Sequence, residues 1–587
     1  MTAQLFEPTG EHDWRLELGA GDLLGEFNRA GVLESSDLHV ARRVGDLAGE
    51  SDEIVLLATA LAVRAVRHGS VCVDLSTVSA VAPELRWPRP DAWTAAVAAS
   101  PLVDAGALRV EHGLLYLDRY HRLERQVCDD LVARLRQPAP DVDERSLEAA
   151  LARVSRGHLS DEQRTAAVRA VRQSTTVLTG GPGTGKTTTV ARILALLADQ
   201  AAARGEPISI ALTAPTGKAA SRLQESVERE LAFLPEEDTA RIGRLEPMTL
   251  HRMLGWRPDN ATRFRHHRGN RLKYDVVVAD EASMVELTMM ARLLEAVRPH
   301  ARLLLVGDPR QLTSVGAGAV LSDLVEGFDG DPSSPVVSLT ENFRSTEDIK
   351  AVAEALRVGD ADGVLASLRA SSSEVEFVET DDAAAALRHD TVSAALDIRR
   401  AAEAGDAQGA VEALDEHRLL CAHREGPHGV RHWNRQVELW LGEELGQVLH
   451  SEWYVGRPLL VTANDYTMEI YNGETGVVVR RDDGRLRARI AGTGGLRDFA
   501  TGRLDAVETM HAMTIHKSQG SQARRITVLL PEADSRLLTR ELFYTAVTRA
   551  QEQVRVVGSE AAVRAAVDTH AQRATGLSQR LAAARDR

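Results

Sequence analysis

Lysine is the scarcest charged residue of this chain. Of the 70 basic side chains in 587 residues, only five are lysines: Lys186, Lys218, Lys273, Lys350 and Lys517. Arginine supplies almost all of the positive charge, so a lysine that persists is a candidate for a chemical role. Lys517, in the stretch AMTIHKSQGSQ, raises the question of which ligand would require it.

Cysteine and long apolar runs are also rare. Cys72, Cys128 and Cys421 lie far apart and form no CxxC pair, which argues against a disulfide framework and a structural zinc site. No run of about 18 apolar residues occurs, and the N-terminal MTAQLFEPTG lacks the basic and apolar parts of a secretion signal. We therefore expect a cytoplasmic protein with no membrane partner.

Positive charge is in deficit overall, because the formal net charge is −15. This balance argues against nucleic-acid binding over the whole surface. Residues 1–150 hold 25 acidic and 15 basic side chains and no lysine, whereas the remaining 437 residues hold 60 acidic and 55 basic ones. The nearly neutral remainder can still contain a local cationic channel, and the acidic first 150 residues are better suited to contact with protein.

After residue 150 the chain alternates between short apolar strands and helices. The runs TTVLT, ALTA, DVVVA and ARLLLVG are each followed by small or acidic residues, as expected of buried parallel strands whose carboxyl ends form a site. This pattern predicts a doubly wound α/β fold. Before it, residues 1–115 mix amphipathic helical stretches with short apolar runs, and RQPAPDVDERS at 136–146 has the composition of a linker.

The strongest local pattern is GGPGTGKT at 180–187, which follows a predicted strand and opens the helical stretch TTTVARILALLADQ. There, glycines allow main-chain N–H groups to surround phosphate, Lys186 neutralises the β- and γ-phosphates, and the Thr187 hydroxyl binds Mg²⁺. The expected cofactors are ATP and Mg²⁺, and a glycine-rich turn without a ligand is the alternative. The predicted loop residues are Gly180, Gly181, Pro182, Gly183, Thr184, Gly185, Lys186, Thr187 and Thr188.

Polar residues follow two further strands. DVVVA runs into Asp280 and Glu281, which predicts a Mg²⁺ ligand at Asp280 and a carboxylate at Glu281 that orients or deprotonates the attacking water. Acidic residues at an ordinary helix start are the alternative. Gln311, beyond the strand of LLLVGDPRQL, is a candidate sensor of the γ-phosphate.

Seven motifs occur in the order found in superfamily 1 DNA helicases. They are LTGGPGTGKTTT, ALTAPTGKAASRL, VVVADEASMV, LLLVGDPRQLTSV, LTENFRS, AMTIHKSQGSQ and LFYTAVTRAQ. They most resemble the RecD family, the alpha subunits of bacterial exonuclease V (RecBCD), and the resemblance extends from about residue 159 to the C-terminus. It implies two RecA-like parallel-sheet cores and 5′→3′ movement along DNA.

The resemblance also implies a division into domains. A mixed, mainly helical N-terminal domain that docks a partner would span 1–115, followed by a helical connection at 116–150. The first core would span 151–340, with a small hairpin insertion at about 257–273. The second core would combine 341–454 and 506–587, separated by a small SH3-like β insertion at 455–505.

The stretch AMTIHKSQGSQ resembles a loop of the second core that contacts single-stranded DNA and the nucleotide site. This gives Lys517 a ligand, although a surface cation is the alternative. Gln522 stands where relatives commonly have Glu, which puts its contact with the nucleotide sugar in doubt. The implied DNA-binding residues are Pro215, Thr216, Gly217, Lys218, His251, Asn464, Tyr466, Asn472, Thr514, His516, Lys517 and Gln519.

Three further residues complete the predicted ATPase site. Arg344 in ENFRS and Arg549 in YTAVTRA match family positions that reach from the second core to the γ-phosphate, although each arginine has a structural alternative. Gln163 in LSDEQR resembles a glutamine that recognises adenine, with a surface role as its alternative. The basic stretch RFRHHRGNRLKYD at 263–275 is either a strand-separating hairpin or a solvated loop.

The resemblance implies an ATP-dependent DNA helicase subunit that processes double-strand ends for recombinational repair. Its expected partners are single-stranded DNA, duplex DNA ends, and RecB-like and RecC-like subunits in a heterotrimer. We see no acidic pattern typical of a nuclease, so any nuclease activity is expected in a partner. The alternative is an ATP-dependent regulatory or clamp subunit that controls a partner nuclease without unwinding DNA itself.

Overall fold

A computed structural model represents the chain. The structure describes residues 5–6, 8, 10, 12–155, 159–257, 263–314, 316–343, 346–380, 382–449, 451–465, 467–492, 495–571 and 573–585. Arg344 and Tyr466, two of the predicted site residues, lie outside the described residues. Within these ranges, none of the helices combines the length and apolar composition needed to cross a membrane.

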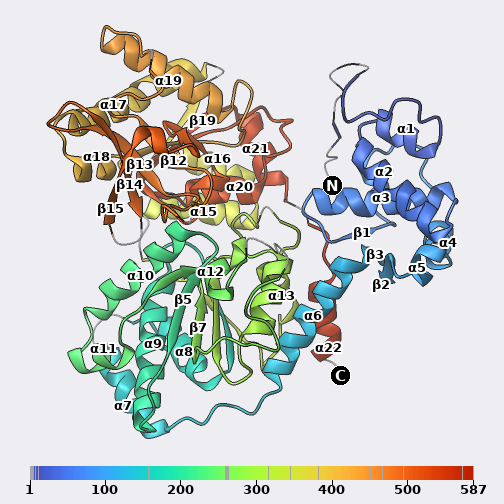
Figure 1. The fold of residues 1–587 in the computed structure, drawn as a ribbon, viewed down its shortest axis with the longest axis horizontal. Coiled ribbons are helices and arrows are strands. Elements are labelled where there is room, and N and C mark those ends of the chain that lie inside the picture. Colours follow the sequence, from blue (N-terminus) through green and yellow to red (C-terminus); the bar gives the residue numbers. More distant parts are fainter. Residues whose placement is uncertain are drawn as a thin grey trace.

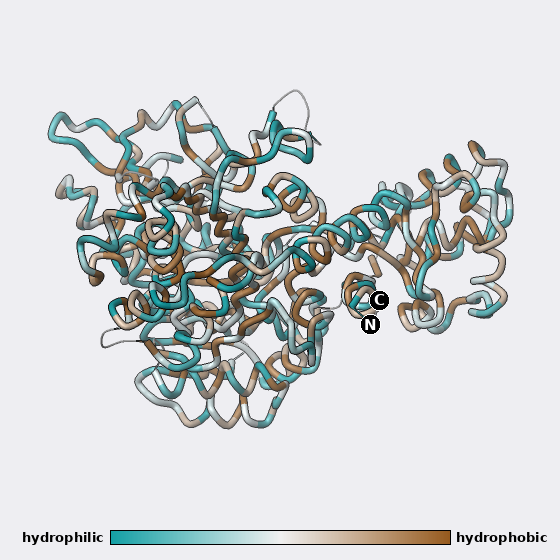
Figure 2. The backbone as a smooth tube through the Cα atoms, turned by 90° about the horizontal axis from the view of Figure 1, so that it is seen from below, coloured by the Kyte–Doolittle hydropathy of each residue, from teal (hydrophilic) through white to brown (hydrophobic). Residues whose placement is uncertain are grey.

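The N-terminal domain is mainly helical, as predicted, and has its own apolar core. Figure 2 shows it standing off from the rest of the molecule. Its three-stranded antiparallel sheet has the order β1-β3-β2. The elements are α1 (Leu23–Arg29), α2 (Ser35–Ala48), α3 (Glu53–Arg67), β1 (Cys72–Asp74), the 3-10 helix η1 (Val78–Val81), α4 (Pro90–Ala98), α5 (Pro101–Asp104), β2 (Leu108–Glu111) and β3 (Leu114–Leu117).

The first core is built on a six-stranded parallel sheet with the order β6-β5-β7-β8-β4-β9. Helices cover both of its faces (Figure 1). The strands are β4 (Thr175–Gly180), β5 (Ile210–Ala214), β6 (Pro247–Thr249), β7 (Val276–Ala279), β8 (Arg302–Gly307) and β9 (Val336–Leu339).

The helices of one face share an apolar core with this sheet. They are α7 (Glu144–Val154), α8 (Asp161–Arg172), α9 (Lys186–Ala203), α10 (Gly217–Leu231) and α11 (Glu236–Ile242). A second apolar core lies under the other face. Its helices are α6 (Asp118–Leu135), α12 (Leu250–Leu254), the 3-10 helix η2 (Ala282–Met284), α13 (Leu287–Ala296), α14 (Val320–Gly327) and α22 (Leu577–Arg585).

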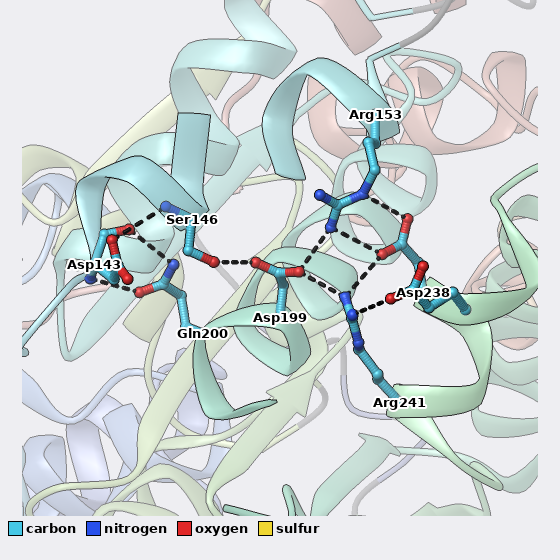
Figure 3. A network of polar contacts seen from close by, with 8 residues as sticks. Asp143, Ser146, Arg153, Asp199, Gln200, Asp238 and Arg241 are labelled. Atoms are coloured by element: carbon cyan, nitrogen blue, oxygen red, sulfur yellow. Dashed lines mark hydrogen bonds and ion pairs between the residues drawn. The ribbon is translucent and has the colours of Figure 1, made fainter. Parts of the chain in front are cut away.

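A polar network ties α7 and α11 to α9, the helix that starts at the phosphate loop (Figure 3). Asp199 of α9 accepts hydrogen bonds from Arg153 of α7 and Arg241 of α11, both at 2.7 Å. Both arginines also reach Asp238 of α11, at 3.1 and 3.4 Å. Since Asp199 and Asp238 are almost completely buried, their charges require these partners.

The second core is a five-stranded parallel sheet with the order β10-β19-β18-β11-β17. The predicted pair of parallel-sheet α/β cores is therefore confirmed. Its strands are β10 (Val375–Glu379), β11 (His417–Cys421), β17 (Ala512–Thr514), β18 (Ala523–Leu529) and β19 (Ala550–Gly558). Its helices are α15 (Glu347–Val358), α16 (Ala361–Arg369), α17 (Ala383–Glu403), α18 (Ala407–Ala413), α19 (Val430–Glu444), the 3-10 helix η4 (His516–Ser518), α20 (Arg540–Val547) and α21 (Glu560–Asp568).

An antiparallel sheet interrupts the second core where the β insertion is expected. Its order is β15-β14-β13-β12-β16, and it encloses a small apolar core. Its likeness to an SH3 fold stays a prediction. The strands are β12 (Pro458–Val461), β13 (Thr475–Arg480), β14 (Leu486–Gly492), β15 (Gly495–Ala500) and β16 (Val507–Thr509), with the 3-10 helix η3 (Thr501–Arg503).

The C-terminal tail returns to the first core and to the N-terminal domain. Helix α22 packs on α6 and α14, and Arg580 pairs with the buried Glu124 of α6 at 3.2 Å. The Glu124 carboxylate also accepts a hydrogen bond from the main-chain N–H of Gly576 at 2.9 Å. The C-terminal tail is thus anchored on α6, while the domain boundaries stay predictions.

Candidate nucleotide and DNA site

The phosphate loop connects β4 to α9 in a left-handed turn. Gly183 and Gly185 have φ angles of 83° and 74°, which favour glycine. Since Gly185 has no side chain that could cap α9, the first main-chain N–H groups of the helix remain available to an anion. Lys186 folds over its own loop and donates to the carbonyl oxygens of Gly180 (2.6 Å) and Gly181 (2.9 Å).

Burial lowers the pKa of Lys186, and the nearby carboxylates of Asp308, Glu281 and Asp280 oppose that shift. The ammonium group therefore lies in a desolvated site where phosphate oxygens would satisfy it better than two carbonyl groups. Thr187 and Thr188 follow in the first turn of α9. Their predicted contacts with phosphate and Mg²⁺ stay predictions.

Gln163 lies against the same loop. Its side chain takes part in the capping box at the start of α8, and its Nε2 donates to the carbonyl oxygen of Thr184 at 3.3 Å. A Cβ atom at Gly185 would lie 2.2 Å from this Nε2, so a side chain at position 185 would displace the glutamine. The structure thus places Gln163 beside the phosphate loop, and its predicted contact with adenine stays a prediction.

The acidic pair follows β7, next to the loop. The main-chain N–H of Asp280 donates to the carbonyl oxygen of Thr213 at 2.8 Å, which fixes the turn against β5. Burial, followed by the charge of Glu281, raises the pKa of Asp280 to about 7. Glu281 adopts a left-handed conformation with φ 50°, the kind of backbone strain that concentrates at functional sites.

Gln311 is held by a neighbouring carboxylate. Its Nε2 donates to Asp308 at 3.1 Å, and Asp308 is a buried group whose pKa is raised by burial. Gln311 Oε1 is buried and has no hydrogen-bond partner among the described residues. An acceptor left open in this way is suited to receive a hydrogen bond from an attacking water.

Arg549 comes from the second core and lies in the same cavity. This cavity has a volume of about 430 Å³, and its lining includes Lys186, Thr187, Asp280, Glu281, Gln311 and Arg549. Burial lowers the pKa of Arg549, against the charges of Glu281 and Asp308. Its guanidinium donates to the carbonyl oxygens of Thr545 (3.1 Å) and Ser521 (3.4 Å). Six of the seven predicted catalytic residues therefore meet in one cavity, and the seventh, Arg344, lies outside the described residues.

Two residues near the nucleotide site were missed by the sequence analysis. Phe343 donates its main-chain N–H to the carbonyl oxygen of Gly183 at 2.9 Å, yet 54% of its surface is exposed. Its ring lies 3.9 Å from the position of a Cβ at Gly185, close to Gln163. The hydroxyl of Tyr544, in α20, hydrogen-bonds to Asp308. Phe343 lies in the motif LTENFRS and Tyr544 in the motif LFYTAVTRAQ. Their positions inside these motifs were the sequence signal that could have identified them.

The predicted DNA residues of the first core contact the β insertion. Gly217 packs so closely on Tyr471 that a Cβ there would lie 2.9 Å from that side chain. Lys218 donates to Thr475 Oγ1 at 3.5 Å, and burial together with Arg418 lowers its pKa to about 7. Pro215 and Thr216 precede it, and Thr216 caps α10. His251 lies apart in α12 and is exposed.

The predicted DNA loop of the second core turns its side chains in three directions. Lys517 pairs with Glu508 at 3.0 Å and remains partly exposed, and the Thr514 hydroxyl accepts from the Lys517 N–H at 3.3 Å. Gln519 instead donates to the first core, and His516 lines a cavity together with residues of the N-terminal domain. In the insertion, Asn464 Oδ1 accepts from the exposed Asn472 N–H at 2.8 Å. The DNA roles of these residues stay predictions.

The basic stretch at 263–275 folds back on the first core. His267 and Asn270 form a short antiparallel bridge, and Arg268 pairs with Asp130 of α6 at 2.8 Å. The Arg265 N–H donates to the carbonyl oxygen of Gly255 at 2.9 Å. The stretch is thus an exposed tight turn anchored at its base, which leaves both of its proposed roles open.

Taken together, a phosphate loop, an acidic pair at the end of a neighbouring strand, and an arginine from a second parallel core define a P-loop ATPase of the helicase type. Family models match the chain in three places: an AAA domain at residues 163–317, a UvrD-like helicase C-terminal domain at 509–557, and the RecBCD enzyme subunit RecD, N-terminal domain, at 29–116. The chain belongs to the RecD family.

Curated relatives are similar in sequence to this chain along most of their length. The RecBCD enzyme subunit RecD of Mycolicibacterium smegmatis is 59% identical over 559 residues, covering 94% of this chain and 98% of the relative. That of Mycobacterium tuberculosis is 58% identical over 569 residues, covering 96% and 97%. The ATP-dependent RecD2 DNA helicase of Deinococcus radiodurans is 32% identical over 489 residues, covering 82% and 61%.

A solved structure of Bacteroides Pif1 bound to ssDNA has 17% identity and a TM-score of 0.37, covering 68% of this chain and 92% of that one. As a member of the RecD family, the chain is an ATP-dependent DNA helicase subunit. The alternative of a regulatory subunit without helicase activity is not favoured.

Proposed function

We propose that this chain is the 5′→3′ motor of a RecBCD-type complex, which binds RecB-like and RecC-like subunits and moves along one strand from a duplex DNA end during recombinational repair. Nuclease activity of the complex would belong to another subunit. The observation that carries the motor role is the cavity in which Lys186 of the first core and Arg549 of the second meet. A nucleotide bound there would contact both cores, so its hydrolysis would alter how they pack.

In this proposal the loop residues bind ATP and the neighbouring strands act on it. Lys186 would exchange its two carbonyl acceptors for phosphate oxygens, and Arg549 would stabilise charge on the γ-phosphate. Glu281 and Gln311 Oε1 would orient the attacking water, with Glu281 accepting its proton. Arg344 would add a second cation from the start of the second core.

Thr187 and Asp280 fit Mg²⁺, because a hydroxyl and a carboxylate are the hard oxygen donors that this ion prefers. The raised pKa of Asp280 agrees with this assignment, because burial and the charge of Glu281 outweigh the nearby cations Lys186 and Arg222, and a bound divalent cation would stabilise the carboxylate further. When bound, Mg²⁺ would supply charge neutralisation to the β- and γ-phosphate oxygens.

The N-terminal domain would dock a partner subunit. Trp14, Leu18 and Leu47 are large apolar residues that are 77%, 69% and 72% exposed, and residues 1–150 carry a marked excess of acidic groups. Exposed aromatic and aliphatic side chains of this kind are typical of protein interfaces.

Strand separation by purified chain, alone and with its co-purified partners, tests the motor. We would compare duplexes that carry a 5′ single-stranded tail with duplexes that carry a 3′ tail. Only the 5′-tailed duplex should be unwound. Lys186→Gln should abolish both ATP hydrolysis and unwinding. Unwinding that survives in Lys186→Gln would contradict the proposed role of the cavity.

A further inference from the structure

A second cavity lies at the junction of the N-terminal domain with the two cores. It has a volume of about 440 Å³, and Figure 1 shows this junction where β1 approaches the segment between α20 and α22. Residues at the end of α3 and in β1 form one wall. Thr313, just beyond Gln311, and His516, in the predicted DNA loop, also line the cavity. The cavity therefore connects the predicted DNA path to the N-terminal domain.

Cationic groups from two domains face each other in this cavity. Burial, and then Arg64, Arg67 and Arg536, lower the pKa of His68 to about 3. Arg536 belongs to the second core, yet it also lowers the pKa of Arg64 in the N-terminal domain. Glu34 and Asp37 pair with Arg67 and also offset the charge of Arg64. The repulsion that remains is between Arg536 and the end of α3, and an anion placed between them would relieve it.

Three arginines, Arg64, Arg536 and Arg573, line the cavity together with two carboxylates. Within the described part of the chain, Arg536 forms no ion pair, and its side chain is exposed. Arg573 donates to the carbonyl oxygens of Gly316 (2.6 Å) and Gly318 (3.2 Å) rather than to a carboxylate. The acidic residues of the lining are Asp74 and Asp568. Asp74 already accepts hydrogen bonds from the N–H (2.9 Å) and hydroxyl (2.6 Å) of Ser76.

We propose that this cavity binds a phosphate of single-stranded DNA where the strand passes His516, with Arg536 as the principal contact and the end of α3 as the opposite wall. The N-terminal domain would then hold DNA directly, in addition to docking a partner. The proposal rests on the proposed function, because it requires that DNA cross the loop at 514–520. A phosphodiester suits the site because it supplies one negative charge and several acceptors to guanidinium groups.

The salt dependence of DNA binding tests the contact. We would measure the binding of a fluorescently labelled oligothymidylate of about 20 nucleotides to the full chain by anisotropy at several salt concentrations. Arg536→Ala should weaken binding roughly fivefold and reduce the slope of log K against log salt by about 0.7, as expected for one lost phosphate contact on a single strand. Arg145→Ala is the control, because Arg145 is exposed on α7. An Arg536→Ala slope equal to that of Arg145→Ala would overturn the proposal.

Photocrosslinking gives a second, independent measurement. Oligonucleotides that carry 4-thiothymidine should crosslink to peptides spanning 64–78 of the wild-type chain. Crosslinks confined to the two cores would overturn the proposal and would leave an acidic protein segment as the occupant of the cavity. If the wild-type chain binds no DNA and its ATPase is not stimulated by DNA, the proposed function itself fails. If instead the wild-type chain binds DNA normally and Arg536→Ala binds equally well, only the proposal for this cavity fails.

Discussion

Gln519 of the second core donates from Nε2 to the main-chain oxygen of Leu312 at 2.7 Å. The main-chain N–H of Leu312 in turn donates to the hydroxyl of Thr545, on α20, at 2.9 Å. Both polar main-chain groups of Leu312 are thus bound by the second core, and the preceding residue is Gln311. Since both hydrogen bonds are buried, the position of Gln311 depends on how the two cores are packed.

Thr545→Val should lower the turnover of DNA-stimulated ATP hydrolysis about tenfold, because a lost interdomain hydrogen bond of roughly 1.4 kcal/mol would misplace Gln311 in the transition state. The KM for ATP should change little, since Thr545 does not line the nucleotide cavity. Steady-state ATPase assays with saturating single-stranded DNA measure both quantities.

Thr548→Val is the matched control for this prediction, because the Thr548 hydroxyl, at the C-terminal cap of α20, donates to the carbonyl oxygen of Thr545 in the same core. Gln519→Ala should behave like Thr545→Val. If Gln519→Ala instead raises the DNA concentration needed for stimulation and leaves turnover intact, Gln519 acts on DNA and the coupling through Leu312 is wrong.

The raised pKa of Asp280 predicts a pH-dependent stability. Its ordinary pKa is near 4 in the unfolded chain and is raised to about 7 in the fold by burial and Glu281. The folded state therefore binds the extra proton, and this contribution to stability is lost as pH rises from about 4 through 7. Asp280→Asn should raise the melting temperature of the metal-free chain at pH 8 and have a smaller effect at pH 5, while abolishing ATP hydrolysis. Thermal unfolding in the presence of a chelator measures the difference, and an equal effect at both pH values would contradict the assigned cause.

The parts of the site that could be predicted from the sequence are those whose structure is local. GGPGTGKT lies between a strand and a helix, and the glycines at 183 and 185 alone require the left-handed turn that is observed. The Asp280 and Glu281 pair is likewise placed by the strand that precedes it. In such motifs the chemistry and the backbone are both set within about ten residues.

Contacts between the cores could not be predicted in this way. The bond from Gln519 to Leu312 joins residues 207 positions apart, and Arg222 of α10 donates to the carbonyl oxygen of Gly520 at 3.1 Å across 298 positions. Nothing in either local pattern specifies how two independently folded sheets dock. For the same reason, the return of the C-terminal tail to Glu124 had no counterpart in the sequence analysis.

Phe343→Ala should raise the KM for ATP about tenfold, with a smaller effect on turnover. The exposed ring lies beside Gln163 at the edge of the phosphate loop, and stacking of a base on an aromatic ring contributes roughly 1–3 kcal/mol. Phe343→Tyr should have a KM for ATP close to that of the wild-type chain, because it keeps the aromatic ring. A KM that is unchanged in Phe343→Ala would show that the base lies elsewhere.

Replacing Trp14 and Leu47 together by serine should abolish co-purification of partner subunits while leaving the DNA-stimulated ATPase intact, because both side chains are exposed on the N-terminal domain. Phe233→Ser is the matched control, since Phe233 is 73% exposed but lies in the first core. Quantitative pull-down through a C-terminal tag compares the three chains. Equal partner recovery from all three would exclude this surface as the docking site.

Asp199→Ala should loosen α7 and α11 without affecting the N-terminal domain. The substitution removes one of the two carboxylates that Arg153 and Arg241 share (Figure 3). Since these guanidiniums are about one-third exposed, we expect a loss of roughly 2 kcal/mol rather than the larger value of a fully buried pair. Amide hydrogen exchange should accelerate roughly 30-fold in peptides from 144–154 and 236–242. Glu206→Ala is the control, because the Arg204–Glu206 pair is exposed and its loss should change exchange little. Uniform acceleration across the whole chain would indicate global destabilisation instead of the local anchoring that the network implies.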